Sequence, residues 1–391
     1  MSKHCLLNRR RALWFSLGTL VGIGTFAGRK EINWSRQIQA LNDSKRDFTV
    51  VGQASLKERA AAKGLIYGSE GEYRTLSSDA KFATCFVREC SMLVNAELKW
   101  YLPSNPLRPS PDRFDFTAGD WLVEFAQLHG LLLRGHTLVW YQSLPPWFEE
   151  TVNSQNAEQF LVKHIRTVVK RYAGKMHSWD VVNEAVDPTA GRSDGLRKTP
   201  WLKFLGPSYI DLAFRLAAEA DPQALLVYND NEMDYDVREN EAKRNAVLKL
   251  LERLKSVGTP IHALGIQAHL LGNETYFNPK KMRNFLKDVA SLGLKILVTE
   301  MDVTDKDLPF NLLVRDRMVA KTYENYLSVV LDEPAVIAVL TWGLSDRYTW
   351  LSQFQPRPDN APVRPLPLDA RMNPKLAWNA IARAFNSAPR R

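Results

Sequence analysis

The chain has 391 residues, of which 45% are hydrophobic, so it is long enough to bury a large core. Its formal net charge is +9, but residues 1–30 hold six basic side chains and no acidic one: Lys3, Arg9, Arg10, Arg11, Arg29 and Lys30. Without that segment the charge falls to +3. The rest of the chain is close to balanced, which argues against a phosphate-binding surface and a nucleic-acid partner.

Residues 1–30 have the pattern of an N-terminal export signal. A basic segment precedes an apolar run over residues 12–27, and Gly28, Arg29 and Lys30 close it. The run has 16 residues, fewer than the roughly 18 expected of a membrane-spanning helix. Arg10 and Arg11 resemble the twin-arginine signals of bacteria. Because no Ala-x-Ala cleavage site occurs, an uncleaved membrane anchor is the alternative. We expect a secreted, periplasmic or membrane-anchored protein.

Strand-like and helix-like segments alternate over the rest of the chain. The predicted strands cover 65–68, 91–95, 131–137, 178–182, 224–228, 263–267, 295–299 and 336–340. The predicted helices cover 54–62, 77–87, 118–128, 157–172, 209–220, 239–254, 279–292, 317–331 and 374–385. Strict alternation implies parallel strands joined by helical crossovers, and eight such units close a (β/α)8 TIM barrel. A doubly wound open sheet is the competitor, but no glycine-rich loop follows the first strand. We expect one α/β barrel domain over residues 31–391.

Polar side chains follow most of the predicted strands, where a barrel builds its site. Glu184 ends the fourth strand and Glu300 ends the seventh. Other strand ends supply amides, histidines and tryptophans: Asn95, Lys99, His136, Trp140, Asn183, Gln267, His269, Asp302, Trp342 and Trp350. Each of these alone is more often a packing or buried structural residue, and Asp180 within the fourth strand is expected to be structural. Their common position at one barrel mouth favours a site.

The chemistry of this set favours glycoside hydrolysis. Two carboxyl groups, one protonated and one ionised, are the usual equipment of that reaction. Aromatic rings stack on sugar rings, and amides bind sugar hydroxyls. The sequence has no Walker lysine, and its Gly-x-Ser-x-Gly match at 191–195 does not directly follow a predicted strand as a nucleophile elbow does, which argues against phosphoryl and acyl transfer. No metal or organic cofactor is expected. Cys85 and Cys90 are interpreted as buried thiols, with a local disulfide as the alternative in an exported protein.

Five motifs in order resemble glycoside hydrolase family 10, the endo-β-1,4-xylanases. They are GHTLVW at 135–140, WDVVNEA at 179–185, GIQAHL at 265–270, VTEMDV at 298–303, and TWG at 341–343 with Asp346 and Trp350. The resemblance spans the whole region after the leader. It implies a retaining endo-β-1,4-xylanase that acts on a polysaccharide. We expect a monomer.

The resemblance also implies roles for individual residues. Glu184 would be the general acid/base and Glu300 the nucleophile, with carboxyl groups about 5 to 5.5 Å apart. Asn183 would bind the 2-hydroxyl of the cleaved sugar, and His269 and Asp302 would keep Glu300 ionised. The remaining residues would line the sugar site: Lys99, His136, Trp140 and Trp342, with Gln267 near the catalytic pair and Trp350 above it.

The chain departs from the family pattern outside the catalytic pair. Asn95 and Ala96 stand where the family has Glu-Asn, whose side chains bind the sugar one step from the cleavage point. Asn95 keeps some of that capacity and is expected to bind substrate, whereas Ala96 keeps none. Tyr141 and Asn231 replace a histidine and a stacking tyrosine. The sequence therefore predicts the reaction more firmly than the substrate. The same mechanism on another β-glycan or on a decorated xylan is an alternative, as is a catalytically weak carbohydrate-binding protein.

Overall fold

The structure is a computed structural model that describes residues 46–273 and 275–391. The predicted leader, residues 1–30, and the start of the predicted domain at residue 31 lie outside the described residues. Within the described ranges, no helix is long and apolar enough to cross a membrane.

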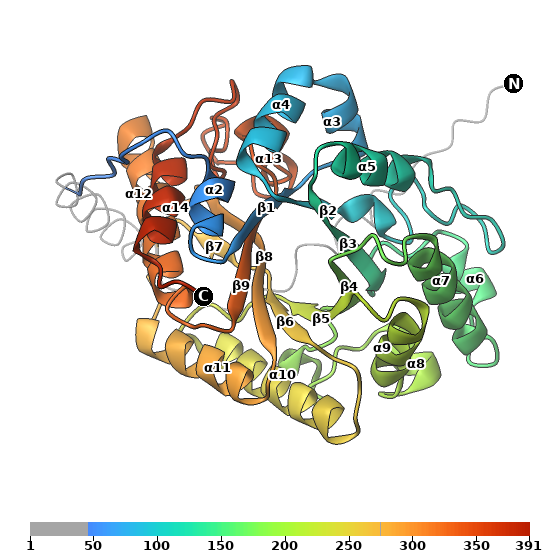
Figure 1. Cartoon of the computed structure of the whole chain (residues 1–391). Helices are drawn as coiled ribbons and strands as arrows, with labels where there is room; N and C mark the ends of the chain where they lie inside the picture. The colour runs from blue at the N-terminus through green and yellow to red at the C-terminus, as the bar shows by residue number, and fades with distance from the viewer. Residues whose placement is uncertain (1–45, 274) are drawn as a thin grey trace, which may run out of the picture. The chain divides into compact units, whose positions relative to one another are not determined.

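Eight parallel strands form a closed barrel in the part of the chain that the structure describes (Figure 1). They are β1 (Ile66–Glu70), β2 (Met92–Asn95), β3 (Leu132–Val139), β4 (Ser178–Asn183), β5 (Leu225–Asp230), β6 (Ala263–Ile266), β8 (Lys295–Thr304) and β9 (Val336–Thr341). Pairing of β9 with β1 closes the ring. The predicted barrel and all eight of its predicted strands are confirmed, with boundaries shifted by a few residues.

The sixth strand continues beyond an interruption that the sequence does not predict. After β6, Gln267 and Ala268 leave the ladder, and Ala268 has a φ of 59°. A short extra strand, β7 (His269–Leu271), then pairs with the second half of β8, with His269 opposite Asp302. The break sets Gln267 and His269 on two separate pieces of backbone at the barrel mouth.

Side chains alternate between the inside and the outside of the barrel, as the two-residue period of a strand requires. Met92 and Val94 of β2 belong to the small apolar cluster inside the barrel. Leu93, between them, belongs to the larger cluster between the strands and the helices. The last inward-facing residues of each strand therefore surround the barrel mouth.

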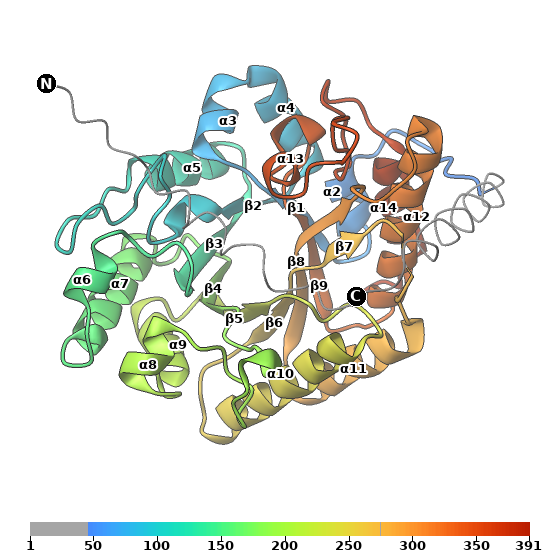
Figure 2. The ribbon, with the colours of Figure 1, turned by 180° about the vertical axis from the view of Figure 1, so that it is seen from behind.

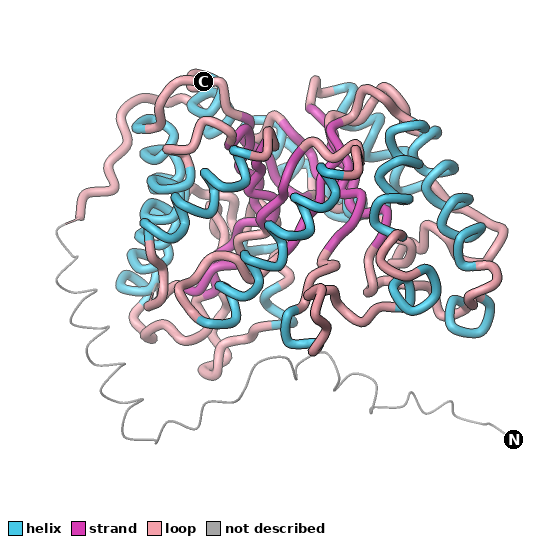
Figure 3. The backbone as a smooth tube through the Cα atoms, turned by 90° about the horizontal axis from the view of Figure 1, so that it is seen from below, coloured by secondary structure: helices cyan, strands magenta, loops and turns pink. Residues whose placement is uncertain are grey.

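Helices surround the strands on all sides, as Figures 1 and 2 show from front and back, and Figure 3 shows from below. The longer ones are α4 (Ala80–Glu89), α5 (Thr117–Leu128), α7 (Ala157–Arg171), α9 (Tyr209–Ala220), α10 (Arg238–Ser256), α11 (Pro279–Ser291), α12 (Leu312–Val330) and α14 (Leu376–Ser387). Short ones are α2 (Leu56–Ala61), α3 (Tyr73–Ser78), α6 (Phe148–Thr151), α8 (Pro200–Leu205) and α13 (Leu351–Phe354).

Two predicted helices differ from the structure because capping side chains set their starts. The predicted helix 77–87 is split into α3 and α4 at Asp79, whose carboxylate accepts a hydrogen bond from the Phe82 amide at 3.0 Å. The predicted helix 317–331 starts earlier, at Leu312, because the Asn311 side chain caps it. Cys85 and Cys90 are both buried and not joined in a disulfide.

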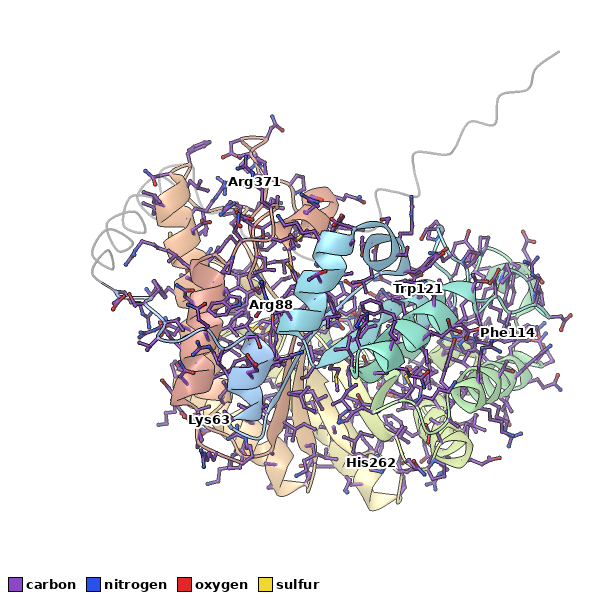
Figure 4. The ribbon with its side chains drawn as sticks, turned by 45° about the horizontal axis from the view of Figure 1, so that its top comes forward. Lys63, Arg88, Phe114, Trp121, His262 and Arg371 are labelled. Atoms are coloured by element: carbon purple, nitrogen blue, oxygen red, sulfur yellow. The ribbon has the colours of Figure 1, made fainter. Side chains whose placement is uncertain are left out.

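Residues that precede or follow strands mark the two ends of the barrel (Figure 4). Lys63 and His262 come shortly before β1 and β6, and both lie at the bottom of that view. Arg371 lies at the opposite end, where its carbonyl accepts a hydrogen bond from Lys81 at the start of α4. The loops after the strands gather at this second end.

Gly135 on β3 is required by a close approach of Trp179 on β4. A Cβ built on Gly135 would stand 2.2 Å from the Trp179 ring. We expect Gly135→Ala to lower the free energy of unfolding by about 1–3 kcal/mol, the usual cost of overpacking a core. Denaturant unfolding of Gly135→Ala, Trp179→Leu and the double variant checks this. The double variant should lose less than the sum of the single losses, and additive losses would contradict the proposed clash.

Candidate active site

Glu184 lies one residue past β4, where the backbone turns sharply. Its φ is 54°, in the left-handed region that non-glycine residues seldom occupy. Two hydrogen bonds hold this conformation: the Glu184 amide donates to the Asn229 carbonyl at 2.9 Å, and its carbonyl accepts from Arg197 Nε at 2.9 Å. The side chain is only 6% exposed. The carboxyl group is therefore fixed in direction and largely withdrawn from water.

Glu300 lies within β8 and is 5% exposed. Its Oε1 accepts a hydrogen bond from Asn229 Nδ2 at 2.7 Å. Its Oε2 is 3.5 Å from His269 Nε2, and its Oε1 is 4.0 Å from His136 Nδ1. Donors and positive groups thus surround this carboxylate, which favours its ionised form.

Three amide side chains connect the two carboxyl groups. Gln267 Nε2 donates to Glu184 Oε1 at 2.9 Å and to Asn183 Oδ1 at 3.3 Å. Asn229 Nδ2 donates to the same Asn183 oxygen at 2.9 Å as well as to Glu300. Three strands therefore hold Glu184 and Glu300 through one continuous network.

The orientation of Asn229 is set by its neighbours. Thr299 Oγ1 donates to Asn229 Oδ1 at 2.7 Å, which turns the amide nitrogen toward Glu300. A Cβ built on Gly265 would stand 2.3 Å from that same oxygen. The glycine of β6 therefore leaves the space that Asn229 occupies.

The two predicted histidines are each held by a buried aspartate. Asp180 Oδ2 is 2.9 Å from His136 Nδ1, and its other oxygen is paired with the buried Arg134. Asp302 Oδ1 is 3.0 Å from His269 Nδ1, and Trp350 donates to the other Asp302 oxygen at 2.7 Å. The structural role expected for Asp180 is consistent with these contacts.

Lys99, Trp140, Trp342 and His136 form one wall of the site. Lys99 Nζ lies 5.4 Å from the ring centroids of both Trp140 and Trp342, within cation–π range. The His136 and Trp342 rings are 5.2 Å apart. Trp201 donates to the Trp140 carbonyl at 3.1 Å and thereby holds that residue. These predicted substrate-binding residues lie together.

Asn95 is a correction to the predicted site. Its side chain is fully buried, its Nδ2 donates to the Gly119 carbonyl of α5 at 3.2 Å, and its Oδ1 accepts from the Glu97 amide. Val94 faces the barrel interior, so the next residue along the strand faces the helices instead. The prediction that Asn95 binds substrate is therefore wrong.

Sequence reasoning assigned no role to Asn229, Arg197 or Glu70. Asn229 is the next-to-last residue of β5. In the sequence it directly follows the predicted strand 224–228, and that position was the available signal. Arg197 lies in a loop without a motif, and only the fold brings it to the Glu184 carbonyl. Glu70 ends β1, in the segment Ser69-Glu70-Gly71, which matches no motif.

The surroundings give the two carboxyl groups opposite acidities. Burial raises the pKa of Glu184 above its ordinary value of 4.5, and the negative charges of Asp230 and Glu300 add to this, while the hydrogen bond from Gln267 opposes it. Burial would also raise the pKa of Glu300. The His269 hydrogen bond and the nearby positive charges outweigh burial and lower that pKa from 4.5 to about 2.

His269 is the main reason for this difference. Burial disfavours its charged form, but Asp302 and Glu300 together raise its pKa from 6.5 to about 10. The imidazole is therefore protonated near neutral pH and donates from both ring nitrogens. Glu184 as a proton carrier and Glu300 as a permanent anion form a pair suited to acid-assisted displacement.

A pH consequence follows from the direction of the Glu300 shift. Because its pKa is lower in the folded chain than the ordinary 4.5, its ionisation stabilises the fold above about pH 4.5. That contribution is lost progressively as the pH falls through 4.5 toward 2. The pKa of Glu184 is shifted upward, so ionisation of Glu184 disfavours the fold at higher pH.

We expect carbon-13 NMR of the glutamate carboxyl groups to show Glu300 ionised throughout the pH range in which the protein stays folded, and Glu184 titrating above pH 4.5. In His269→Asn the pKa of Glu300 should rise, because the variant loses a positive donor. The Glu184 titration of the same variant is the internal control and should move less. Glu300 titrating above Glu184 in the wild type would contradict this assignment.

The family model described as glycosyl hydrolase family 10 matches residues 55–384. Endo-1,4-beta-xylanase B of Thermotoga neapolitana is 32% identical over 319 residues, which cover 81% of this chain and 86% of that protein. Beta-1,4-xylanase of Dictyoglomus thermophilum is 33% identical over 305 residues, which cover 74% of this chain and 81% of that protein.

Solved structures of xylanases are similar to this chain in fold. Native xylanase 10B from Thermotoga maritima superposes with a TM-score of 0.76 at 33% identity, covering 85% of this chain and 98% of that one. Xylanase 10B from Thermotoga petrophila, solved in complex with xylobiose, gives the same TM-score at 32% identity, covering 86% and 98%. The resemblance found in the motifs is thus confirmed, and the chain belongs to glycosyl hydrolase family 10.

Proposed function

We propose that this protein is a retaining endo-β-1,4-xylanase that cleaves internal bonds of xylan by double displacement. The observation that carries the proposal is the pair of buried carboxyl groups, Glu184 and Glu300, whose pKa values are shifted in opposite directions. The relatives named as xylanases support xylan as the substrate.

In the first step, a carboxylate oxygen of Glu300 attacks the anomeric carbon of the bound sugar. The bond from that carbon to the glycosidic oxygen breaks, and Glu184 gives its proton to the departing oxygen. A glycosyl ester on Glu300 and a free sugar hydroxyl result. Asn183, whose side chain donates to Glu184 at 3.2 Å, would bind the 2-hydroxyl of that sugar.

In the second step, Glu184 acts as a base. Esterification removes the negative charge of Glu300, which is one of the influences that raise the pKa of Glu184. The pKa of Glu184 therefore falls, and its carboxyl group stays ionised after it has given up its proton. It takes a proton from water, the water oxygen attacks the anomeric carbon, and the ester bond breaks. Glu184 regains its proton, Glu300 regains its charge, and two inversions give retention.

We also propose that residues 1–30 direct export of the chain and that residues 31–391 form the catalytic domain. The twin arginines and the short apolar run support the first statement. The family match over residues 55–384 supports the second.

Ala96, Tyr141 and Asn231 depart from the family pattern. The preferred glycan is therefore tested by measuring hydrolysis of several polysaccharides. We expect reducing sugar to be released from glucuronoxylan and arabinoxylan, and not from a soluble cellulose derivative. Glu300→Ala should lose at least about three orders of magnitude in turnover, because it removes the nucleophile. Release from another β-glycan alone would keep the mechanism and change the substrate. Binding without any release would support the carbohydrate-binding alternative.

The stereochemistry of hydrolysis tests the roles of Glu184 and Glu300 independently of rate. We expect proton NMR of a xylo-oligosaccharide digest to show the β-anomer of the new reducing end first, followed by slow mutarotation. A retaining pair separated by about 5 to 5.5 Å gives this result, whereas a wider pair gives the α-anomer first. Initial appearance of the α-anomer would therefore exclude Glu300 as a covalent nucleophile.

A further inference from the structure

Glu70 is a third carboxyl group at the barrel mouth. It is the last residue of β1, and its register follows that of Ile66, which packs on the apolar cluster inside the barrel. Residues two and four positions apart on a strand share a face, so the Glu70 side chain points inward at the end where the site lies. On one side, Glu70 pairs with Val94 of β2, and on the other β1 pairs with β9, which leads to Trp342.

The surroundings of Glu70 differ from those of the other carboxyl groups nearby. Glu97 is buried, and it accepts hydrogen bonds from the Tyr73 amide at 3.1 Å and from Asn105 at 3.3 Å. Glu72 is exposed. Glu70 is half-buried, and its side chain has no hydrogen-bond or ion-pair partner among the residues that the structure describes. A partly desolvated carboxyl group without a partner is costly unless a ligand satisfies it.

Glu70 lies on the side of the site formed by β1, β2 and β9, because β1 pairs with both β2 and β9. Burial raises its pKa from 4.5 to about 8, Glu72, Glu97 and Glu300 add to this, and Lys99 opposes it. The group is therefore largely protonated near neutral pH and can both donate to and accept from sugar hydroxyls.

In the proposed mechanism, Glu184 protonates the departing oxygen from its position just past β4. The leaving sugars would therefore lie toward β4, and the retained sugars would lie on the opposite side, toward Lys99 and Trp342. Here the polar groups that the sequence led us to expect are missing: Asn95 points into the helix layer and Ala96 has no polar side chain. Glu70 is the inward-facing polar side chain that the structure supplies in their place.

We propose that Glu70 binds the hydroxyl groups of the retained sugar one step beyond the cleaved one. The proposal rests on the proposed xylanase function. Glu70 on β1 would thus make the sugar contact that Asn95 and Ala96, at the end of β2, do not make.

Two chromogenic substrates separate this contact from the chemistry. 4-Nitrophenyl β-xyloside places one sugar on the retained side, and 4-nitrophenyl β-xylobioside places two. We expect Glu70→Ala to lower kcat/KM for the xylobioside by roughly ten-fold or more, the effect of losing a hydrogen bond to a partly charged group. The value for the xyloside should stay within about two-fold of the wild type. Glu70→Gln should recover part of the loss, because an amide also donates and accepts.

Glu72→Ala is the matched control. It removes an exposed carboxyl group whose charge acts on the pKa of Glu70, but it leaves the Glu70 side chain in place, so both substrates should stay within about two-fold of the wild type. Equal losses on both substrates, or a loss that follows a lower Tm, would make Glu70 structural and overturn the proposal. An unchanged xylobioside value would also overturn it while leaving the xylanase function intact. If the wild type cleaves neither substrate, the proposed function fails. Titration calorimetry with xylobiose then decides on Glu70, whose alanine variant must bind roughly ten-fold more weakly.

Discussion

The whole site depends on the hydrogen bonds of one amide, Asn229. From β5 its side chain donates to Glu300 on β8 and to Asn183 on β4, and the main-chain carbonyl of the same residue accepts a hydrogen bond from the Glu184 amide. Thr299 fixes its orientation, and the absence of a side chain on Gly265 provides its space. One buried side chain thus ties three strands and both catalytic carboxyl groups to a common geometry.

The barrel makes this arrangement possible because parallel strands bring their carboxyl ends together. Residues separated by more than a hundred positions in the sequence meet at one mouth, where water is largely excluded. Burial on its own raises the pKa of both glutamates, so burial alone would give two proton carriers. The positively charged His269, held by Asp302, separates them and leaves Glu300 as the anion.

The sequence predicted the fold and the catalytic pair because both leave local signals. Each strand contains a short run of mostly apolar residues, and Glu184 and Glu300 directly follow predicted strands within recognisable motifs. Asn95 was assigned wrongly because a strand-end motif does not say which face a residue is on, and a shift of one residue reverses it. Glu70 was missed for the same reason, since its role depends on the inward register of β1. The division of the predicted helix 77–87 into α3 and α4 was not predicted, because it depends on the hydrogen bond by which Asp79 caps α4.

The amide network between the glutamates has one further consequence. Gln267, Asn183 and Asn229 carry no titratable proton near neutral pH, and each nitrogen is committed as a donor. Such a bridge fixes the positions of the two carboxyl groups but does not conduct protons between them, although the charge of Glu300 still acts on Glu184. The proton that Glu184 gives to the leaving sugar is therefore not replaced from Glu300. In the proposed mechanism it is restored only in the second step, by the water that cleaves the ester.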